Sequence, residues 1–144
     1  MTKTFDMQFI RYMNLFEKVT RISSSHCFNY NNTLVFVVPR HLVQRAIGKD
    51  NSNLKQLSTI LEKRIRVLAE PKSMADLNQF FTVLVSPITF EKLDVVTNDG
   101  VKELVITTGN RESKAMLIGR DRLREKEMKD ALDQHFDIKN IRIM

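Results

Sequence analysis

Two short stretches of the chain combine a glycine, a cation and a carboxylate in the same order. The first is Ile47-Gly48-Lys49-Asp50-Asn51, and the second is Ile118-Gly119-Arg120-Asp121-Arg122. A glycine that ends one helix and leads into another presents the free N–H groups of the second helix. Those groups and the helix dipole favour phosphate oxygens, and a cation in the turn adds charge attraction. The two stretches therefore predict phosphate binding at two places, 71 residues apart.

The predicted contacts include polar and basic side chains on either side of each turn. Two of the residues, Ile47 and Ile118, are interpreted either as apolar contacts for the ligand or as core residues. The full set of predicted binding residues is Arg45, Ile47, Gly48, Lys49, Asp50, Asn51, Asn53, Lys55, Lys114, Ile118, Gly119, Arg120, Asp121, Arg122 and Arg124.

The positive charge of the chain is concentrated around the same two turns. The formal net charge is +6, which favours a polyanionic partner. Residues 40–66 carry +5 and residues 111–129 carry +3, whereas residues 67–110 carry −3. Two basic blocks at matching places in the chain are harder to explain as ordinary solvated helix faces than one block would be. The acidic segment between them is a candidate contact for a protein partner.

Hydrophobic spacing predicts the elements that position the first turn. Apolar residues from Phe5 to Phe16 recur every three or four positions, with Thr4 as a helix N-cap and Asp6 in the first helical turn. The expected elements are a helix at 4–20, strands at 27–30 and 34–38, a helix at 40–47, a helix from 51 or 52, and a strand at 64–68. The order is helix, strand, strand, helix, helix, strand.

The same order of elements recurs around the second turn. A helix begins at Ser73 or Asp76, and Asp99-Gly100 predicts the turn of a hairpin. The remaining elements expected are strands at 93–97 and 101–107, helices at 111–118 and 123–136, and a strand at 138–143. The repetition predicts a duplicated module of about 70 residues, with domains at 1–70 and 71–144.

Each turn, placed between two helices, resembles the Ile-Gly-x-x-Gly loop of a KH domain. The order that opens with a helix resembles the type II form, and two such modules without an S1 domain resemble the archaeal NusA-like transcription termination factors. The resemblance implies an α+β fold of two tandem type II KH domains. Each domain would be α-β-β-α-α-β, a three-stranded sheet with helices on one face.

The resemblance also implies a function and partners. It implies binding of single-stranded RNA, the nascent transcript, and contact with RNA polymerase, with no cofactor and no catalysis. One extended RNA strand held across both turns is the mechanism that two such modules suggest. Alternatives are a degenerate KH scaffold that binds RNA polymerase or a ribosomal particle through protein contacts, and a KH protein of ribosome assembly.

Both turns depart from the family pattern at the same two positions. Asn51 and Arg122 stand where a second glycine is expected, and Asn adopts the left-handed conformation more readily than Arg. Asp50 and Asp121 would either repel a phosphate or cap the helix that follows. The first turn is the better candidate for RNA binding, because Asn51 is the milder departure and its block is more positive.

Other chemistry finds little support in the sequence. Cys27 is the only cysteine, which rules out an internal disulfide and a cysteine-rich zinc site. His41 and His135 are isolated, without metal-ligand spacing around them. No apolar run approaches the roughly 18–20 residues of a membrane span, and the N-terminus is unlike a signal peptide. The sequence therefore predicts a cytoplasmic binding protein that is not an enzyme.

Overall fold

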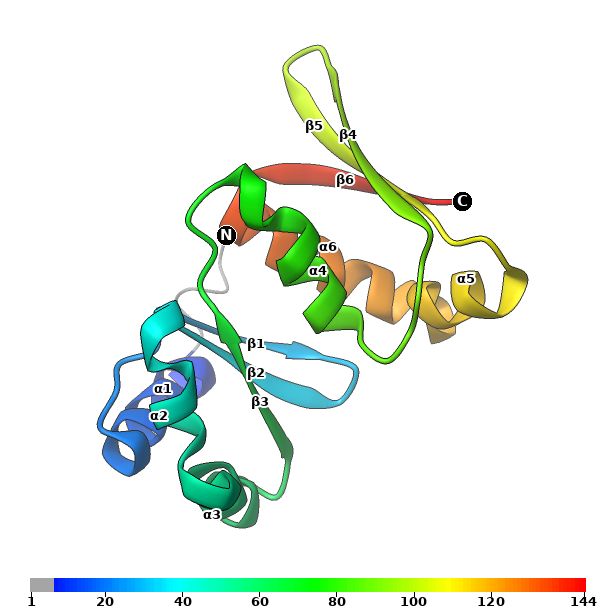
Figure 1. The fold of residues 1–144 in the computed structure, drawn as a ribbon. Coiled ribbons are helices and arrows are strands. Elements are labelled where there is room, and N and C mark those ends of the chain that lie inside the picture. The colour runs from blue at the N-terminus through cyan, green and yellow to red at the C-terminus, as the bar shows by residue number, and fades with distance from the viewer. Residues whose placement is uncertain (1–6) are drawn as a thin grey trace. The chain divides into compact units, whose positions relative to one another are not determined.

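Six α-helices and two three-stranded sheets follow one another in a computed structural model that describes residues 7–144 (Figure 1). The mixed α+β class expected from the sequence is confirmed. The chain divides into two units between Glu70 and Pro71. The proposed cap at Thr4 and the acidic first turn at Asp6 lie outside the described residues. No helix in the described range is long and apolar enough to cross a membrane.

The first unit has the expected order of elements. Its strand β2 pairs antiparallel with β1 and parallel with β3, so β3 is an edge of the sheet. The region expected as one helix at 40–47 begins with a 3₁₀ turn, Arg40–Leu42, directly after Pro39. The elements are α1 (Met7–Thr20), β1 (His26–Tyr30), β2 (Thr33–Val38), α2 (Val43–Ile47), α3 (Ser52–Leu61) and β3 (Arg64–Ala69).

The core of the first unit forms where α1 meets the sheet. Phe16 of α1 is fully buried and stacks on Phe36 of β2, with ring centroids 4.3 Å apart. The apolar stripe expected on the first helix is therefore core, as its helical spacing indicated. Cys27 is buried beside these rings, and burial raises the pKa of its thiol to about 12. A thiol so rarely ionised is a poor nucleophile, so Cys27 acts as a core residue.

The second unit repeats this order with a shorter first helix, longer hairpin strands and longer second and third helices. Ser73 accepts a hydrogen bond from Ala75 N at the start of the helical region, and Asp99 and Gly100 turn the hairpin with φ of 52° and 80°. The sheet order is β4-β5-β6, with β5 in the centre. The elements are α4 (Leu77–Val85), β4 (Lys92–Asn98), β5 (Val101–Thr107), α5 (Arg111–Ile118), α6 (Leu123–Phe136) and β6 (Ile138–Ile143).

Candidate nucleic-acid interface

The glycines of the two turns have nearly the same backbone conformation. Gly48 has φ 84° and ψ 165°, and Gly119 has φ 77° and ψ 172°. A Cβ on Gly48 would lie 2.7 Å from Ser52 Oγ, and a Cβ on Gly119 would lie 2.9 Å from the Cβ of Arg124. Both the positive φ and the lack of space therefore require glycine at these positions.

Each glycine also ends the preceding helix with the same hydrogen bond. Gly48 N donates to Gln44 O and Gly119 N donates to Ala115 O, at 3.0 Å in both cases. These bonds satisfy one carbonyl at the end of α2 and one at the end of α5. The helix–turn–helix expected around each glycine is therefore present in both units.

The third and fourth residues of each turn are left-handed. Asp50 and Asn51 have φ of 55° and 61°, and Asp121 and Arg122 have φ of 54° and 60°. The N–H of the fourth residue closes each turn onto the glycine carbonyl, at 3.1 Å from Asn51 and 3.2 Å from Arg122. Arg122 thus adopts the left-handed conformation, although arginine takes it less readily than asparagine. Neither carboxylate caps the next helix, because Asn51 and Arg122 hold the cap positions and no side chain bonds there.

The side chains of Asn53 and Arg124 stabilise the turns by hydrogen bonds to the end of the preceding helix. Asn53 Nδ2 donates to the carbonyls of Arg45 at 3.3 Å and Ala46 at 3.2 Å, which lie at the end of α2. Arg124 Nη1 donates to Met116 O at 3.0 Å, the corresponding place at the end of α5. Both side chains hold the end of one helix against the start of the next, and so fix the geometry of the turn.

The remaining predicted residues differ in their exposure. Ile47 is half-buried and packs against the core of the first unit, and Ile118 is also half-buried. The core interpretation therefore applies to Ile47. The predicted cations around the glycines are exposed to solvent: Arg45, Lys49, Lys55, Lys114 and Arg120.

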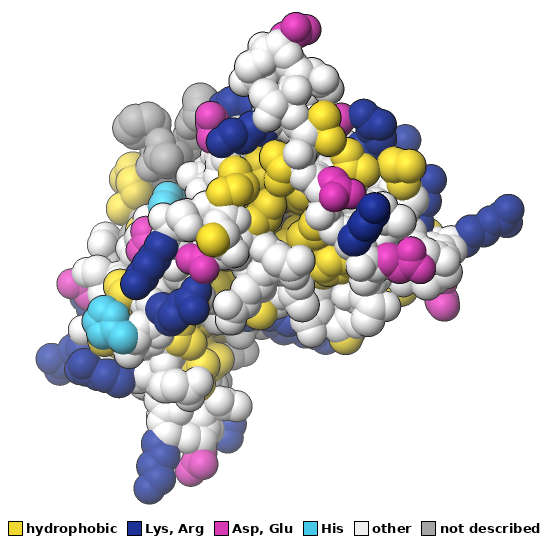
Figure 2. Space-filling model, turned by 45° about the horizontal axis from the view of Figure 1, so that its top comes forward, with side chains coloured by type: hydrophobic (Ala, Val, Ile, Leu, Met, Phe, Trp, Pro, Cys, Tyr) yellow, Lys and Arg dark blue, Asp and Glu magenta, His cyan; other side chains and the backbone are white. Residues whose placement is uncertain are grey.

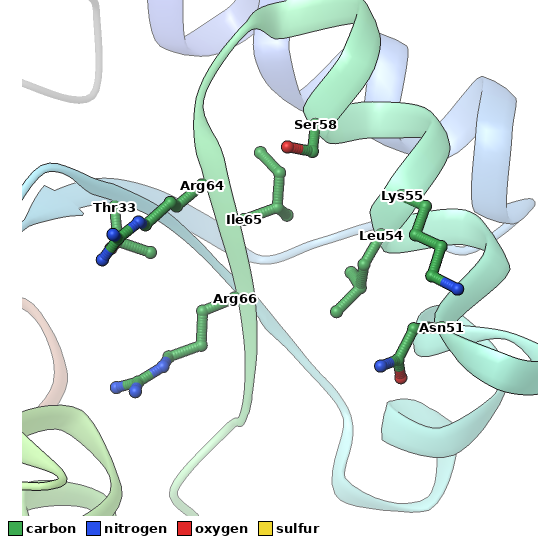
Figure 3. Close-up of a pocket in the computed structure, with 8 residues that line it drawn as sticks. All are labelled: Thr33, Asn51, Leu54, Lys55, Ser58, Arg64, Ile65 and Arg66. Carbon is green, nitrogen blue, oxygen red and sulfur yellow. The ribbon is translucent and has the colours of Figure 1, made fainter.

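A groove with a volume of about 440 Å³ lies beside the first turn, between α3 and β3 (Figure 3). Leu54 and Ile65 point toward each other across it, and Asn51 lies at the end of α3 nearest the turn. Three of the lining residues are cations and none is a carboxylate. The lining residues are Thr33, Asn51, Leu54, Lys55, Ser58, Arg64, Ile65 and Arg66.

The sequence pattern led to only two of these lining residues, Asn51 and Lys55. The strand residues Arg64, Ile65 and Arg66 were missed as binding candidates, although a strand was correctly expected at 64–68. What marks these residues is that two arginines lie on an edge strand of the sheet. That position depends on the strand order, which the local sequence does not show. The arginines extend from the side of β3 opposite to Ile65 (Figure 3).

The repeat allows each groove position to be matched in the second unit. Leu34 pairs with Ile65 in the first sheet, and Leu104 pairs with Ile141 in the second. Matched through these parallel pairs, the neighbouring Thr33 corresponds to Glu103; counted from the hairpin turns instead, Thr33 corresponds to Val101.

Two further matches follow from the same reasoning. Arg66 and Arg142 each follow the paired isoleucine by one residue, so they correspond to each other. Leu54 and Glu125 each stand six residues after the turn glycine. The second unit thus has carboxylates at two positions where the first unit has the uncharged Thr33 and Leu54.

Both of these carboxylates form ion pairs within the second unit. Arg122 Nη1 lies 2.9 Å from Glu125 Oε1, and Arg142 Nη2 lies 2.7 Å from Glu103 Oε1. The carboxylate side chains are only 22% and 18% exposed, whereas the arginines are 74% and 56% exposed. The two carboxylates are therefore mostly covered by the second unit, and their negative charges offset the positive charges of the two arginines.

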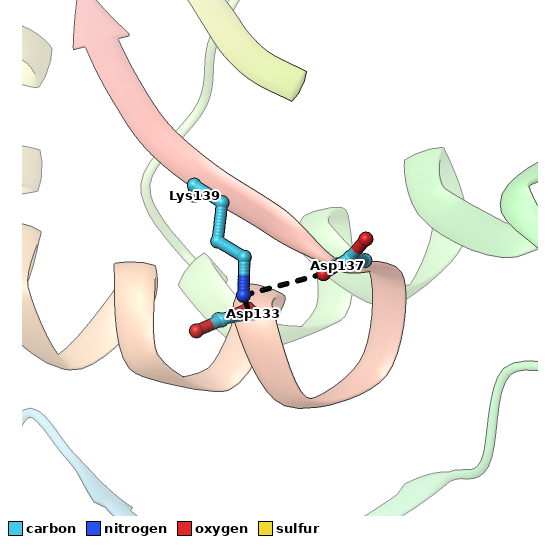
Figure 4. Close-up of polar contacts among 3 residues, drawn as sticks. All are labelled: Asp133, Asp137 and Lys139. Atoms are coloured by element: carbon cyan, nitrogen blue, oxygen red, sulfur yellow. Dashed lines mark hydrogen bonds and ion pairs between the residues drawn. The ribbon is translucent and has the colours of Figure 1, made fainter. Parts of the chain in front are cut away.

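A third cation of the second unit is paired in the same way. Lys139, at the irregularity where β6 joins β5, lies between Asp133 at 2.8 Å and Asp137 at 3.3 Å (Figure 4). Its hydrogen bond to Asp133, followed by that to Asp137, raises the pKa of the Lys139 ammonium. In contrast, the structure gives neither Lys55 nor Arg64 a carboxylate partner within the described range.

Surface charge on its own does not mark a site. Basic and acidic side chains are interspersed on the face drawn in Figure 2. Among residues 7–144 no group of three His, Cys, Asp or Glu side chains could hold a metal ion. The candidate interface is therefore defined by local geometry, namely a turn, a groove and the charges that line it.

Comparison with known proteins points to a class of transcription proteins. The chain is 25% identical over 146 residues to a protein of Thermoplasma acidophilum, covering 97% of this chain and 94% of that relative. It is also 25% identical over 134 residues to a protein of Halococcus morrhuae, covering 93% of each chain. Both relatives are named "Probable transcription termination protein NusA". No family model matches the chain.

A solved structure shares the fold over nearly the whole chain. The crystal structure of APE1850 superposes with a TM-score of 0.68 at 26% sequence identity, covering 96% of this chain and 99% of that one. The chain is thus similar in sequence to archaeal NusA proteins, and the resemblance inferred from the two turns is confirmed.

Proposed function

We propose that the chain binds single-stranded RNA through its first unit and acts in transcription as a NusA-like termination factor. The two units are two tandem type II KH modules, residues 1–70 and 71–144. The observation that carries the proposal is the groove beside the first turn. Its lining contains two apolar side chains, Lys55 and no carboxylate, and Arg64 and Arg66 border it with side chains that extend from the far side of β3.

The geometry supports a division of the RNA between turn and groove. Phosphates lie at the turn, where Ser52 N donates to Lys49 O, the next N–H groups of α3 have no acceptor within the helix, and Lys49 and Lys55 supply charge. A base lies in the groove against Leu54 and Ile65. The function is positioning, since the site offers no arrangement of groups for breaking a bond.

The partners follow from this function. The names of the relatives concern transcription termination, so the RNA is the nascent transcript and RNA polymerase is the second partner. A role in transcription requires only that the transcript be held while the polymerase pauses or releases it. No chemistry on the RNA is needed for this.

The direct test is the salt dependence of RNA binding. Fluorescence anisotropy with a labelled single-stranded RNA of mixed sequence measures the dissociation constant between about 50 and 200 mM salt, where phosphate contacts lose affinity steeply. Each phosphate contact adds about −0.7 to the slope of log K against log salt. A duplex of the same length is the matched ligand, and it should bind more weakly.

The outcomes separate RNA binding from a protein scaffold. Absence of RNA binding at low salt contradicts the proposal. In that case a partner that stays bound in a lysate after nuclease treatment indicates a protein scaffold. Equal affinity for single strands and duplexes contradicts the assignment of the groove to an unpaired base.

A further inference from the structure

The second turn already has an anion of its own. Glu125 lies in the first turn of α6, where a carboxylate interacts favourably with the helix dipole and with the free N–H groups. Arg122 holds this carboxylate at 2.9 Å, and the Glu125 side chain is only 22% exposed. The positive helix end that would attract a phosphate is therefore partly neutralised from within the unit.

The sheet side of the second unit is neutralised in the same way. Glu103 pairs with Arg142, and Arg142 corresponds to Arg66 of the first groove. A nucleic-acid backbone approaching this side would have to separate the pair and would then face an unpaired carboxylate. Charges of like sign brought together at an interface are a common means of excluding a ligand.

We propose that Glu103 and Glu125 close the second unit to RNA, so that the chain holds RNA through its first unit alone. This inference rests on the proposed function. It replaces the expectation that one strand runs across both turns. The two carboxylates act as determinants of where RNA binds, because the backbone of the second turn is otherwise the same as that of the first.

The test gives the second unit the side chains of the first. The variant E103T/E125L removes both carboxylates, and isothermal titration calorimetry with short RNAs of about four nucleotides, the length held by one KH module, counts the sites. The unaltered protein should bind one oligonucleotide per chain, and the variant should bind two. The variant E103Q/E125Q removes the charges with less change in shape and should give the same gain.

A second set of variants, in which the first site is weakened by substitution, separates the two sites. K49E/K55E should weaken the first site about 30-fold, so that calorimetry no longer counts it, and adding E103T/E125L should restore one site per chain. The matched control D94T/E112L adds the same positive charge on β4 and at the start of α5, and should leave the count at one. Far-ultraviolet circular dichroism of each variant identifies any that fail to fold.

The result that overturns the inference differs from the result that overturns the function. Two oligonucleotides bound by the unaltered chain, or one bound by both folded glutamate variants, would reject the closing role of Glu103 and Glu125 and leave RNA binding intact. No binding by the unaltered chain or by any variant would reject RNA binding itself. A second site in D94T/E112L would show that total charge, not position, decides.

Discussion

The two turns differ far less in backbone than in the charges that surround them. Gly48 and Gly119 agree in φ within a few degrees, and both are followed by two left-handed residues. The hydrogen bonds that close the turns recur at matching positions. The side chains next to them do not match, since Leu54 is replaced by Glu125. A shared backbone motif therefore does not imply a shared ligand.

The ion pairs of Glu103 and Glu125 are expected to contribute little to the stability of the second unit. Ion pairs with an exposed arginine contribute about 0–1 kcal/mol, because water screens them and ordering the side chains costs entropy. Arg122 and Arg142 are 74% and 56% exposed, so their pairs belong to this class. The effect of Glu103 and Glu125 is therefore expected in binding more than in folding, and the difference between the units can be transferred by substitution.

The largest effect is expected when the acids of the second unit are moved into the first. T33E/L54E places two carboxylates in the groove beside the first turn, and single-stranded RNA should bind about 100-fold more weakly, which corresponds to about 2.7 kcal/mol. Fluorescence anisotropy measures the loss. T33Q/L54Q, which is polar but uncharged, is the control and should lose much less. An equal loss in both variants would assign the effect to shape.

A charge reversal in each turn gives the next largest effect. K49E/K55E should weaken RNA binding about 30-fold and lower the salt slope by about 1.4, the value for two lost phosphate contacts on a single strand. R120E/K126E changes the corresponding residues of the second turn and should alter affinity less than about twofold. If the second variant loses as much affinity as the first, the two turns bind RNA alike and the comparison fails.

The sequence was sufficient to predict the order of elements and both turns. The apolar spacing of Phe9, Met13 and Phe16 and the Asp99-Gly100 hairpin are local signals, and local signals are what a sequence pattern records. The positions of Gly48 and Gly119 followed for the same reason. The expected boundaries were within a few residues of those observed, except that the helix expected at 40–47 begins with a 3₁₀ turn.

The groove could not be predicted because it depends on contacts between distant segments. Arg64 and Arg66 belong to its lining only because β3 is an edge strand that pairs parallel to β2, and this order is not visible in the local pattern. Glu103 and Arg142 form their pair across two strands, 39 residues apart. The roles of such residues become visible only when the strand register is known.

Alanine at the turn glycines should reduce stability in both units and RNA affinity in one. A Cβ at Gly48 or Gly119 meets neighbouring atoms at 2.7 and 2.9 Å, and the positive φ adds backbone strain. G48A and G119A should each lower the free energy of unfolding by about 1–2 kcal/mol, measured in urea.

The RNA affinity of the two glycine variants is the sharper comparison. Because the first N–H groups of α3 must stay in place, only G48A should also weaken RNA binding, by about tenfold. The loss of affinity reports on RNA contacts only where most of the G48A protein is folded at the binding temperature, so that unfolding cannot account for it. If G119A weakens RNA binding by as much as G48A, the second turn also contacts RNA.

The smallest effect is expected at Arg122, where two local energies oppose each other. The left-handed conformation at φ 60° costs an L-residue such as arginine about 1 kcal/mol, and asparagine tolerates it better. The exposed ion pair with Glu125 stabilises the protein by less than this cost. R122N should therefore raise the free energy of unfolding by about 0.5 kcal/mol.

The reverse exchange tests the same balance in the first unit. N51R introduces arginine at φ 61°, and Leu54 offers it no carboxylate, so the free energy of unfolding should fall by about 1 kcal/mol. If R122N lowers stability instead, the ion pair with Glu125 outweighs the backbone strain. Arginine would then be retained at this position for its contact with Glu125, and the two carboxylates would contribute to folding as well as to the exclusion of RNA.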